Sequence, residues 1–294
     1  MLVPIIALLV VVIVIPGIWA IILSFTQYTP GNVPIFNDIQ NYIQIIRDRF
    51  FKNALANNLI FVVVVVALEF IIGLGSALLL NRKFPLQKLW VSLLIAPYCI
   101  SEVVACVMWR YMLDPSYGFV NYALSFLGLG PIAWFGTVTS SFIGIIIVTV
   151  WKNFPFIMII AYSALTAMPQ EVIEASKIDG ANRIQTFRFV VFQLIKPALL
   201  VGLTFRIIFA LREFGIIWIL TEGGPAGGTE ILPIYLYRQT FRYYEFGRGA
   251  ATTTIMLIVT ILISIPLVKW TFSKKSYPFL PVIFRAELII LPKG

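Results

Sequence analysis

The sequence predicts an all-α polytopic membrane protein with six transmembrane helices. Hydrophobic residues make up 60% and charged residues 12% of the 294 residues, whereas soluble domains are about 45–50% apolar and about 25% charged. The mean hydropathy is +0.95. Six apolar segments also have the length that a span requires, because about 20 apolar residues cross about 30 Å of hydrocarbon. We therefore expect one transmembrane domain over residues 1–294.

The predicted spans follow one another with polar connections between them. They cover residues 2–24, 57–81, 89–112, 139–163, 198–220 and 249–271. The first span has no basic residue ahead of it and exceeds the apolar core of a signal peptide. We therefore expect a genuine first helix whose natural N-terminal extension lies outside this sequence. Cys99 and Cys106 lie on the third span, about 10 Å apart along a helix axis, which is too far for a disulfide.

The connections on the side opposite the termini carry interfacial and turn-forming residues. The first, residues 25–56, includes an amphipathic stretch over 41–55 that suits a helix on the membrane surface or against a partner. The third is rich in Gly over 221–229, which predicts a turn. It continues into an aromatic-rich stretch over 235–244 that suits the membrane–water interface on the outer side. The terminal residues 278–294 carry no motif that predicts a structure.

Basic residues predict the orientation of the chain in the membrane. With six spans, both termini lie on the same side as the connections 82–88 and 164–197, and that side carries twelve Lys and Arg residues. The opposite side carries six. Because the side richer in Lys and Arg faces the cytoplasm, we expect cytoplasmic termini in a bacterial or archaeal inner membrane. The net charge of +9 largely reflects this asymmetry and does not predict binding to nucleic acid.

A polar segment, residues 168–197, separates the fourth and fifth predicted spans and contains a short helix. Pro169 precedes the helix, Glu171 lies in its first turn, and Gly180 follows Asp179 where the helix ends. These residues are typical helix start and stop signals. A well-capped polar helix in so apolar a chain indicates a docking site for a soluble protein.

The residue types present exclude several kinds of catalysis. The chain contains no histidine, which excludes His-based acid–base catalysis, His zinc sites and Ser-His-Asp triads. It contains no phosphate-binding loop of the G-x-x-x-x-G-K-[ST] type. Glu171 and Glu174 lie one turn apart on the exposed helix, as solvated docking charges do. We expect neither a membrane-embedded enzyme nor an ion-coupled transporter, since the repeated halves and broken helices of the latter are not apparent.

Four stretches resemble the permease family of maltose-type ABC sugar importers and together cover most of the chain. They are 81–122, with Ala96-Pro97-Tyr98; the segment Glu174-Ala175-x-x-x-Asp179-Gly180-Ala181; Leu220-Thr-x-Gly-Gly-Pro225; and 237–250. The resemblance implies the type I importer permease fold. It also implies two cytoplasmic ATPase subunits, which bind ATP and Mg, an extracytoplasmic solute-binding protein and a second permease subunit in a heterodimer, with a homodimer left open. By itself the chain would be no enzyme and would hold no cofactor or metal.

In this family a short cytoplasmic helix docks on the ATPase subunit. By resemblance its coupling residues here are Glu171, Glu174, Ala175, Asp179 and Gly180. Ser176 replaces a family Ala, and Gln193 stands where the family usually has Pro, which puts the local turn in doubt. Gly180 permits the left-handed conformation that ends such a helix.

Family sugar-contacting positions predict a substrate pathway on the fourth and fifth spans. They correspond to Thr149, Lys152, Asn153, Phe156, Arg206, Phe209, Ala210 and Glu213. Cations suit carboxylates or phosphates, so we expect an oligosaccharide, with uronates such as alginate fragments favoured. Neutral oligosaccharides and glycerol-phosphate diesters remain alternatives. Equally, Arg206 and Glu213, seven residues apart and therefore on one helix face, could pair with each other or with the companion subunit. Glu69 is expected to meet a neighbouring helix or the subunit interface, and Glu102 is open to either role.

Overall fold

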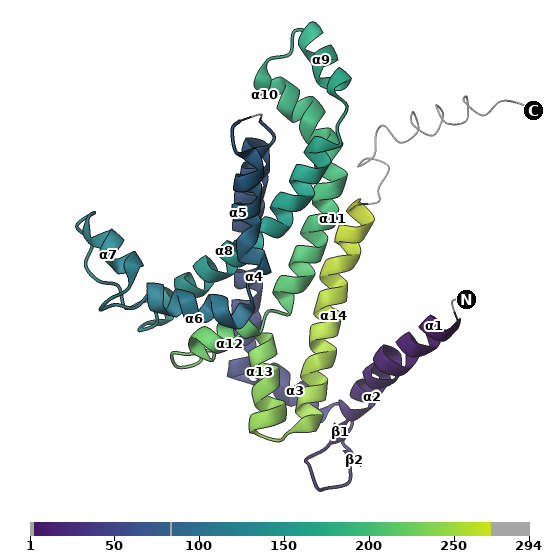
Figure 1. Cartoon of the computed structure of the whole chain (residues 1–294). Coiled ribbons are helices and arrows are strands. Elements are labelled where there is room, and N and C mark those ends of the chain that lie inside the picture. The colour runs from purple at the N-terminus through teal and green to yellow at the C-terminus, as the bar shows by residue number, and fades with distance from the viewer. Residues whose placement is uncertain (1–2, 83, 272–294) are drawn as a thin grey trace, which may run out of the picture. The chain divides into compact units, whose positions relative to one another are not determined.

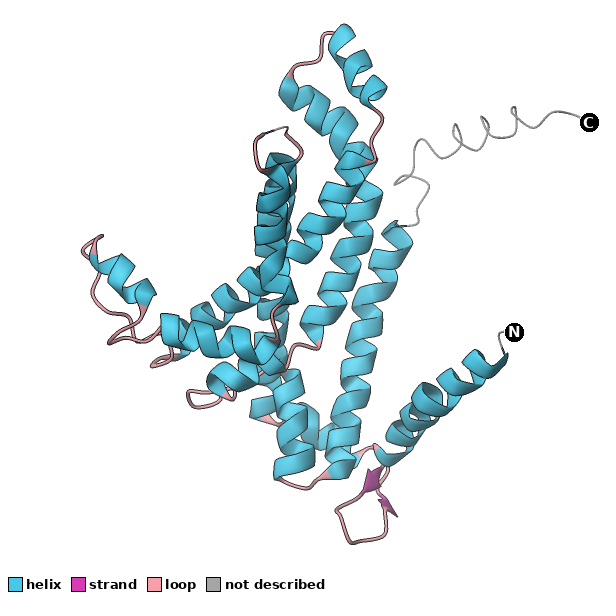
Figure 2. Ribbon diagram, in the orientation of Figure 1, coloured by secondary structure: helices cyan, strands magenta, loops and turns pink. Residues whose placement is uncertain are grey.

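The computed structural model describes residues 3–82 and 84–271. Helices make up most of the described chain, and a short antiparallel hairpin pairs β1 (Thr26–Gln27) with β2 (Ile35–Phe36) (Figures 1 and 2). The chain divides into two compact units, and the long helices α4 (Arg49–Leu80), α8 (Val138–Thr166) and α14 (Phe246–Thr271) each contribute residues to both of them. The predicted tail over 278–294 lies outside the described residues.

The first unit comprises residues up to Val65, Ile100–Trp151 and Phe209–Ile261. Its helices are α1 (Val3–Leu9), η1 (Val10–Val14), α2 (Ile15–Leu23), α3 (Gln40–Arg47), α6 (Glu102–Met112), α7 (Phe119–Ser125), α12 (Gly215–Thr221), α13 (Leu232–Tyr237) and η3 (Arg238–Arg242), with the first parts of α4, α8 and α14. A buried cluster packs Ile45 and Phe51 against Leu232 and Tyr235. The amphipathic stretch predicted over 41–55 therefore forms α3 and the start of α4, with Ile45 and Phe51 in this core and Ile46 and Phe50 exposed.

The second unit comprises Val66–Cys99, Lys152–Ile208 and the end of α14 from Leu262. Its further helices are α5 (Gln87–Cys99), α9 (Gln170–Ile178), α10 (Arg183–Gln185), η2 (Thr186–Val191) and α11 (Phe192–Leu211). Its core includes Ala77, Met158 and Leu199, which join α4, α8 and α11. The backbones of α4 and α8 approach closely at Gly73, where a Cβ would lie 2.9 Å from the Ile157 Cβ and the Phe154 carbonyl oxygen. Small residues allow membrane helices to pack in this way.

The membrane helices confirm the predicted fold class. Five helices are long and apolar enough to span a membrane within the described residues: Pro4–Leu23, Arg49–Leu80, Val138–Thr166, Arg183–Leu211 and Phe246–Trp270. A sixth is obtained if α5 and α6 together form one broken span.

The third predicted span, 89–112, is not one continuous helix. It breaks after Cys99 and resumes at Glu102, with Ser101 in an extended conformation at the new N-cap. Pro97 lies in the last turn of α5, where the missing N–H and the ring weaken the helix. The apolar composition continues through the break, which is why hydropathy predicted a single span.

The fifth predicted span, 198–220, is displaced along the chain. The helix runs over Arg183–Leu211 and ends before a non-helical linker, residues 212–214, that precedes α12. The polar connection therefore ends at Asn182, not at Pro197, and Gln193 lies inside the helix instead of in a turn. The prediction that Arg206 and Glu213 share a helix face is wrong, because Glu213 lies in the linker.

Candidate functional site

The predicted docking helix is present as α9, Gln170–Ile178, in the second unit. Pro169 stands at its N-cap with extended backbone, and Glu171 lies in the first turn, where a negative charge favours the helix dipole. The last turn carries Lys177, which suits the opposite end of the dipole. The local sequence signals therefore predicted both ends of this helix correctly.

Hydrogen bonds fix the turn between α9 and α10, residues 179–182, which we call the corner. Gly180 has a φ of +81°, its amide donates to the Lys177 carbonyl (3.0 Å), and the Ala181 amide donates to the Ser176 carbonyl (3.0 Å). This pair of bonds is the Schellman motif. Asn182 then caps α10 in a capping box with Gln185. Only four residues thus join α9 to the helix of the fifth span.

One side of α9 packs inward and the rest faces solvent. Ser176 is buried, and its hydroxyl lies 3.3 Å from the Thr186 hydroxyl on η2. The predicted coupling residues Glu171, Glu174, Ala175, Asp179 and Gly180 are all exposed.

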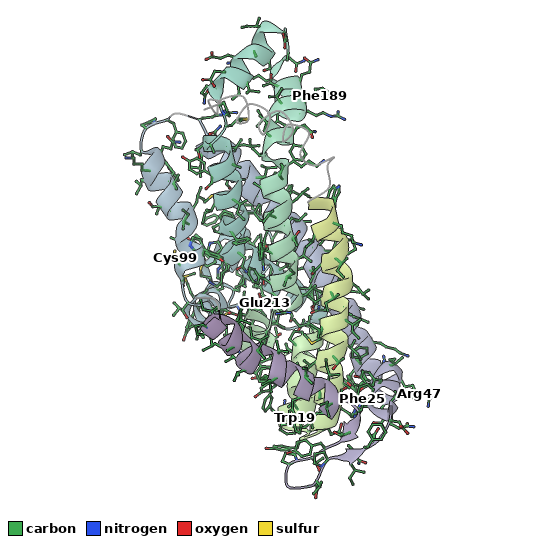
Figure 3. The ribbon with its side chains drawn as sticks, turned by 90° about the vertical axis from the view of Figure 1, so that its right-hand side faces the viewer. Trp19, Phe25, Arg47, Cys99, Phe189 and Glu213 are labelled. Atoms are coloured by element: carbon green, nitrogen blue, oxygen red, sulfur yellow. The ribbon has the colours of Figure 1, made fainter. Side chains whose placement is uncertain are left out.

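Large apolar side chains also stand exposed around the corner. Ile178 is 86% and Ile184 78% exposed, and Phe189 projects from the adjoining helix (Figure 3). Exposed apolar residues beside charged ones are typical of a protein interaction site.

The predicted pathway residue Arg206 forms a buried ion pair with Glu69 inside the second unit. The guanidinium Nε donates to Glu69 Oε2, and Nη2 donates to Oε1 at 2.8 Å, so the pair is bidentate. The Arg206 side chain is 4% exposed and that of Glu69 is 0% exposed. Glu69 therefore meets a neighbouring helix, as expected, and it provides a partner for Arg206 that the sequence did not predict.

The pathway residues of the fourth span lie on α8, where they were expected. Thr149 is buried and donates to the Ile145 carbonyl (2.8 Å). Lys152, Asn153 and Phe156 follow at helical spacing and are half-buried. The Phe156 ring lies 6.1 Å from that of Tyr98, centroid to centroid. Tyr98 belongs to the Ala96-Pro97-Tyr98 stretch that resembles the family, but it lies on a different helix and was not predicted to line the pathway.

The remaining pathway residues end the fifth span and begin the linker. Phe209 is 50% exposed, whereas Ala210 is fully buried. Glu213 is half-buried in the linker that precedes α12 (Figure 3). Phe209 and Glu213 are therefore more exposed than Arg206, which is almost fully buried.

Glu102, whose role the sequence left open, contacts α12 in the first unit. A Cβ built on Gly215 would overlap the Glu102 carboxylate, so only glycine leaves room for it. Among the described residues, none offers a hydrogen bond to the buried Glu102 Oε1 atom. On the same helix, Trp109 packs edge-on against Trp151 of α8, with ring centroids 5.6 Å apart. No pattern in the sequence predicted this tryptophan pair.

The Gly-rich turn predicted over 221–229 is present and is held from several directions. Glu222 has a left-handed backbone, and the Gly224–Pro225 peptide is cis. The Asn57 side chain donates to the carbonyls of Gly228 and Glu230, each at 3.0 Å. Arg238 Nη1 donates to Glu230 Oε2 at 2.5 Å. This turn is therefore anchored to α4 and η3 within the first unit.

Comparison with known proteins supports the resemblance that the sequence predicted. The family model described as binding-protein-dependent transport system inner membrane component matches residues 69–271. The trehalose/maltose transport system permease protein MalF of Thermococcus litoralis is 35% identical over 228 residues, covering 78% of this chain and 76% of MalF. The probable starch degradation products transport system permease protein AmyD of Thermoanaerobacterium thermosulfurigenes is 30% identical over 87% of both chains.

Solved structures agree on the fold. A chain of a bacterial ABC transporter involved in the import of the acidic polysaccharide alginate has a TM-score of 0.81 at 21% identity, over 92% of this chain and 93% of that chain. The type I importer permease fold that the sequence predicted is thereby confirmed. This protein is a multi-pass membrane protein that belongs to the family of binding-protein-dependent transport system inner membrane components.

Proposed function

We propose that the chain is the transmembrane subunit of an ATP-driven importer that moves a saccharide delivered by an extracytoplasmic binding protein. A second permease subunit would complete the pathway, and two ATPase subunits would bind ATP and Mg on the cytoplasmic side. The sugar class rests on the relatives, which are named as permeases for trehalose and maltose and for starch degradation products. The cytoplasmic placement of α9 and of both termini rests on the asymmetry of Lys and Arg.

The observation that carries this proposal is the exposed α9, which follows Pro169 and ends in the Schellman motif. A helix of nine residues is marginal in water by itself. This one is held at its C-terminal end by the bonds of Gly180 and Ala181, and it presents Glu174 and Ala175 outward. Its small Ala face permits close packing, and the Glu174 carboxylate offers a charge partner. These properties suit a cleft on an ATPase subunit.

The preference for acidic sugars now depends on Lys152 more than on Arg206. The guanidinium of Arg206 donates from Nε and Nη2 to Glu69 and its side chain is only 4% exposed, which leaves it poorly placed to bind a substrate carboxylate. We therefore propose Lys152, Asn153 and Phe156 as the substrate contacts on α8, with uronate oligosaccharides favoured. Neutral oligosaccharides and glycerol-phosphate diesters remain the alternatives to test.

The test is ATPase activity of the assembled complex in liposomes, with its binding protein and a panel of neutral and uronate oligosaccharides. We expect stimulation by a saccharide, and its loss in Glu174→Ala with the complex still folded. Glu222→Gln, which removes an exposed carboxylate in the first unit, serves as the matched control and should leave stimulation unchanged.

The same assay separates the substrate classes. Stimulation by uronates that falls in Lys152→Gln would support an acidic substrate. Stimulation by neutral sugars alone would retain the importer and reject the acidic preference. Absence of any associated ATPase would overturn the proposed role of α9.

A further inference from the structure

The second unit contains a pocket of about 370 Å³ between the end of α4, α9 and the first turns of the fifth-span helix. We call it the basic pocket. Its apolar wall consists of Leu78, Ile173, Phe187 and Val191. Leu78, Ile173 and Val191 also pack against the core of the unit, so the wall is held in place from behind. The pocket thus has a fixed apolar surface that is open on one side.

Three cations surround this apolar wall. Arg82 follows the end of α4, Lys177 lies in the last turn of α9, and Arg183 opens α10. In the part of the chain that the structure describes, none of the three forms an ion pair with a carboxylate. All three are exposed. Three positive charges at one opening attract an anion, and no side chain of the described chain supplies it.

The position of the pocket along the spans indicates the kind of anion. The apolar run of α4 ends at Leu80, and Arg183, at the start of the fifth-span helix, lines the same pocket as Arg82. Arg82 therefore lies where the hydrocarbon around α4 gives way to lipid headgroups, a level at which basic pockets between membrane helices bind anionic headgroups. A small inorganic anion would leave the apolar wall in water, whereas a lipid covers the wall and meets the cations.

We propose that the basic pocket binds an anionic glycerophospholipid. The phosphate group lies between Arg82, Lys177 and Arg183, and an acyl chain covers Leu78 and Val191. Because Lys177 belongs to α9, the lipid joins α9 to the end of α4. The bound lipid therefore stabilises the position of α9, and this role is independent of which substrate the transporter carries.

The test is lipid binding to the purified complex in detergent, measured by native mass spectrometry during titration with phosphatidylglycerol. Phosphatidylcholine with the same acyl chains and inorganic phosphate are the comparison probes. We expect saturable binding of phosphatidylglycerol, no saturable binding of phosphatidylcholine, and little displacement by phosphate. In Arg82→Gln/Arg183→Gln the affinity for phosphatidylglycerol falls about 10- to 30-fold, since each cation near the membrane surface strengthens the binding of anionic lipid by severalfold.

Two further variants make the result specific to the pocket. Lys88→Gln/Arg188→Gln removes the same charge from exposed residues that do not line the pocket, and its affinity should change by less than about twofold. Arg82→Lys/Arg183→Lys keeps the charge, so its binding should stay within about threefold of the wild type even if the glutamine variant is unstable.

Three outcomes would overturn the proposal. Equal loss of affinity in the pocket and control variants would indicate general charge attraction. Complete displacement by inorganic phosphate would indicate a free-anion site. Loss of the ATPase subunits from the glutamine variant, with no phosphatidylglycerol bound to the wild type, would indicate an acidic segment of a partner protein.

Discussion

Separating Glu69 from Arg206 is expected to destabilise the second unit more than any single exposed substitution. Both side chains are almost fully buried. Two hydrogen bonds join them, so each charge has the other as its partner. Arg206→Leu leaves the Glu69 carboxylate without a counter-ion, and Glu69→Leu does the same to Arg206. Removing one partner of a buried pair costs about 3–5 kcal/mol, because the remaining charge stays desolvated. Each single variant should therefore lose about 3 kcal/mol or more.

The double variant Glu69→Leu/Arg206→Leu should recover most of that loss. Replacing a buried ion pair with apolar residues of similar volume is often neutral or stabilising, and leucine is favourable within a membrane span. The expected coupling energy is thus about 5 kcal/mol or more, because the two single losses sum to about 6 kcal/mol and the double variant loses little. Reversible unfolding of the purified protein in mixed micelles, titrated with a denaturing detergent, gives the four free energies.

Additive losses would refute this interpretation. If the coupling energy fell below about 0.5 kcal/mol, the two side chains would act independently and the ion pair would contribute little. Transport gives a second, independent result. Since Glu69 already occupies the Arg206 guanidinium, the folded double variant should keep substrate-stimulated ATPase activity. Loss of stimulation at normal stability would instead place Arg206 in contact with substrate.

Three further predictions concern backbone space and charge. Gly73→Ala should lower the free energy of unfolding by about 1–3 kcal/mol because its Cβ would overlap α8. The control Gly75→Ala should be neutral, because its Cβ would have no neighbour within 4 Å in the described part of the chain; equal effects in detergent unfolding would contradict the close approach. Gly180→Ala should cost about 1 kcal/mol through its left-handed φ, seen as about fivefold faster amide exchange in α9, and unchanged exchange would argue against the Schellman corner. Burial raises the pKa of Glu230 above 4.5, although Arg238 opposes the shift. The folded protein then binds more protons than the unfolded chain, so stability falls as pH rises from 4.5 through the raised pKa; Glu230→Gln should flatten this slope in thermal unfolding, and a persistent slope would reject Glu230 as its source.

Local features were predictable from the sequence, and contacts between distant segments were not. The two ends of α9 follow from Pro169 and Gly180, whose backbone preferences act within a few residues. The pairing of Glu69 with Arg206 joins positions 137 residues apart. Both charges lie within predicted spans and therefore need a partner, but helical spacing suggested Glu213 for Arg206, because Glu213 shares the same apolar run.

Hydropathy also could not locate the two breaks in the helices. The apolar composition continues from Ile216 into α12 after the linker, so the window that predicted the fifth span moved toward the C-terminus. Its true start at Arg183 was hidden by charged residues over 183–196, which were assigned to the polar connection although they belong to the first turns of a helix. In the third span, Pro97 was the one local signal of a break, and proline is also tolerated inside membrane helices such as α8.

The closed corner between α9 and the fifth-span helix has a mechanical consequence. The amides of Gly180, Ala181 and Asn182 are all already bonded, to Lys177, Ser176 and Gln185 respectively. The corner therefore cannot lengthen or swivel without breaking one of these bonds. A displacement of α9 is therefore transmitted to the adjoining helix, because the connection between them is rigid and cannot lengthen to absorb it.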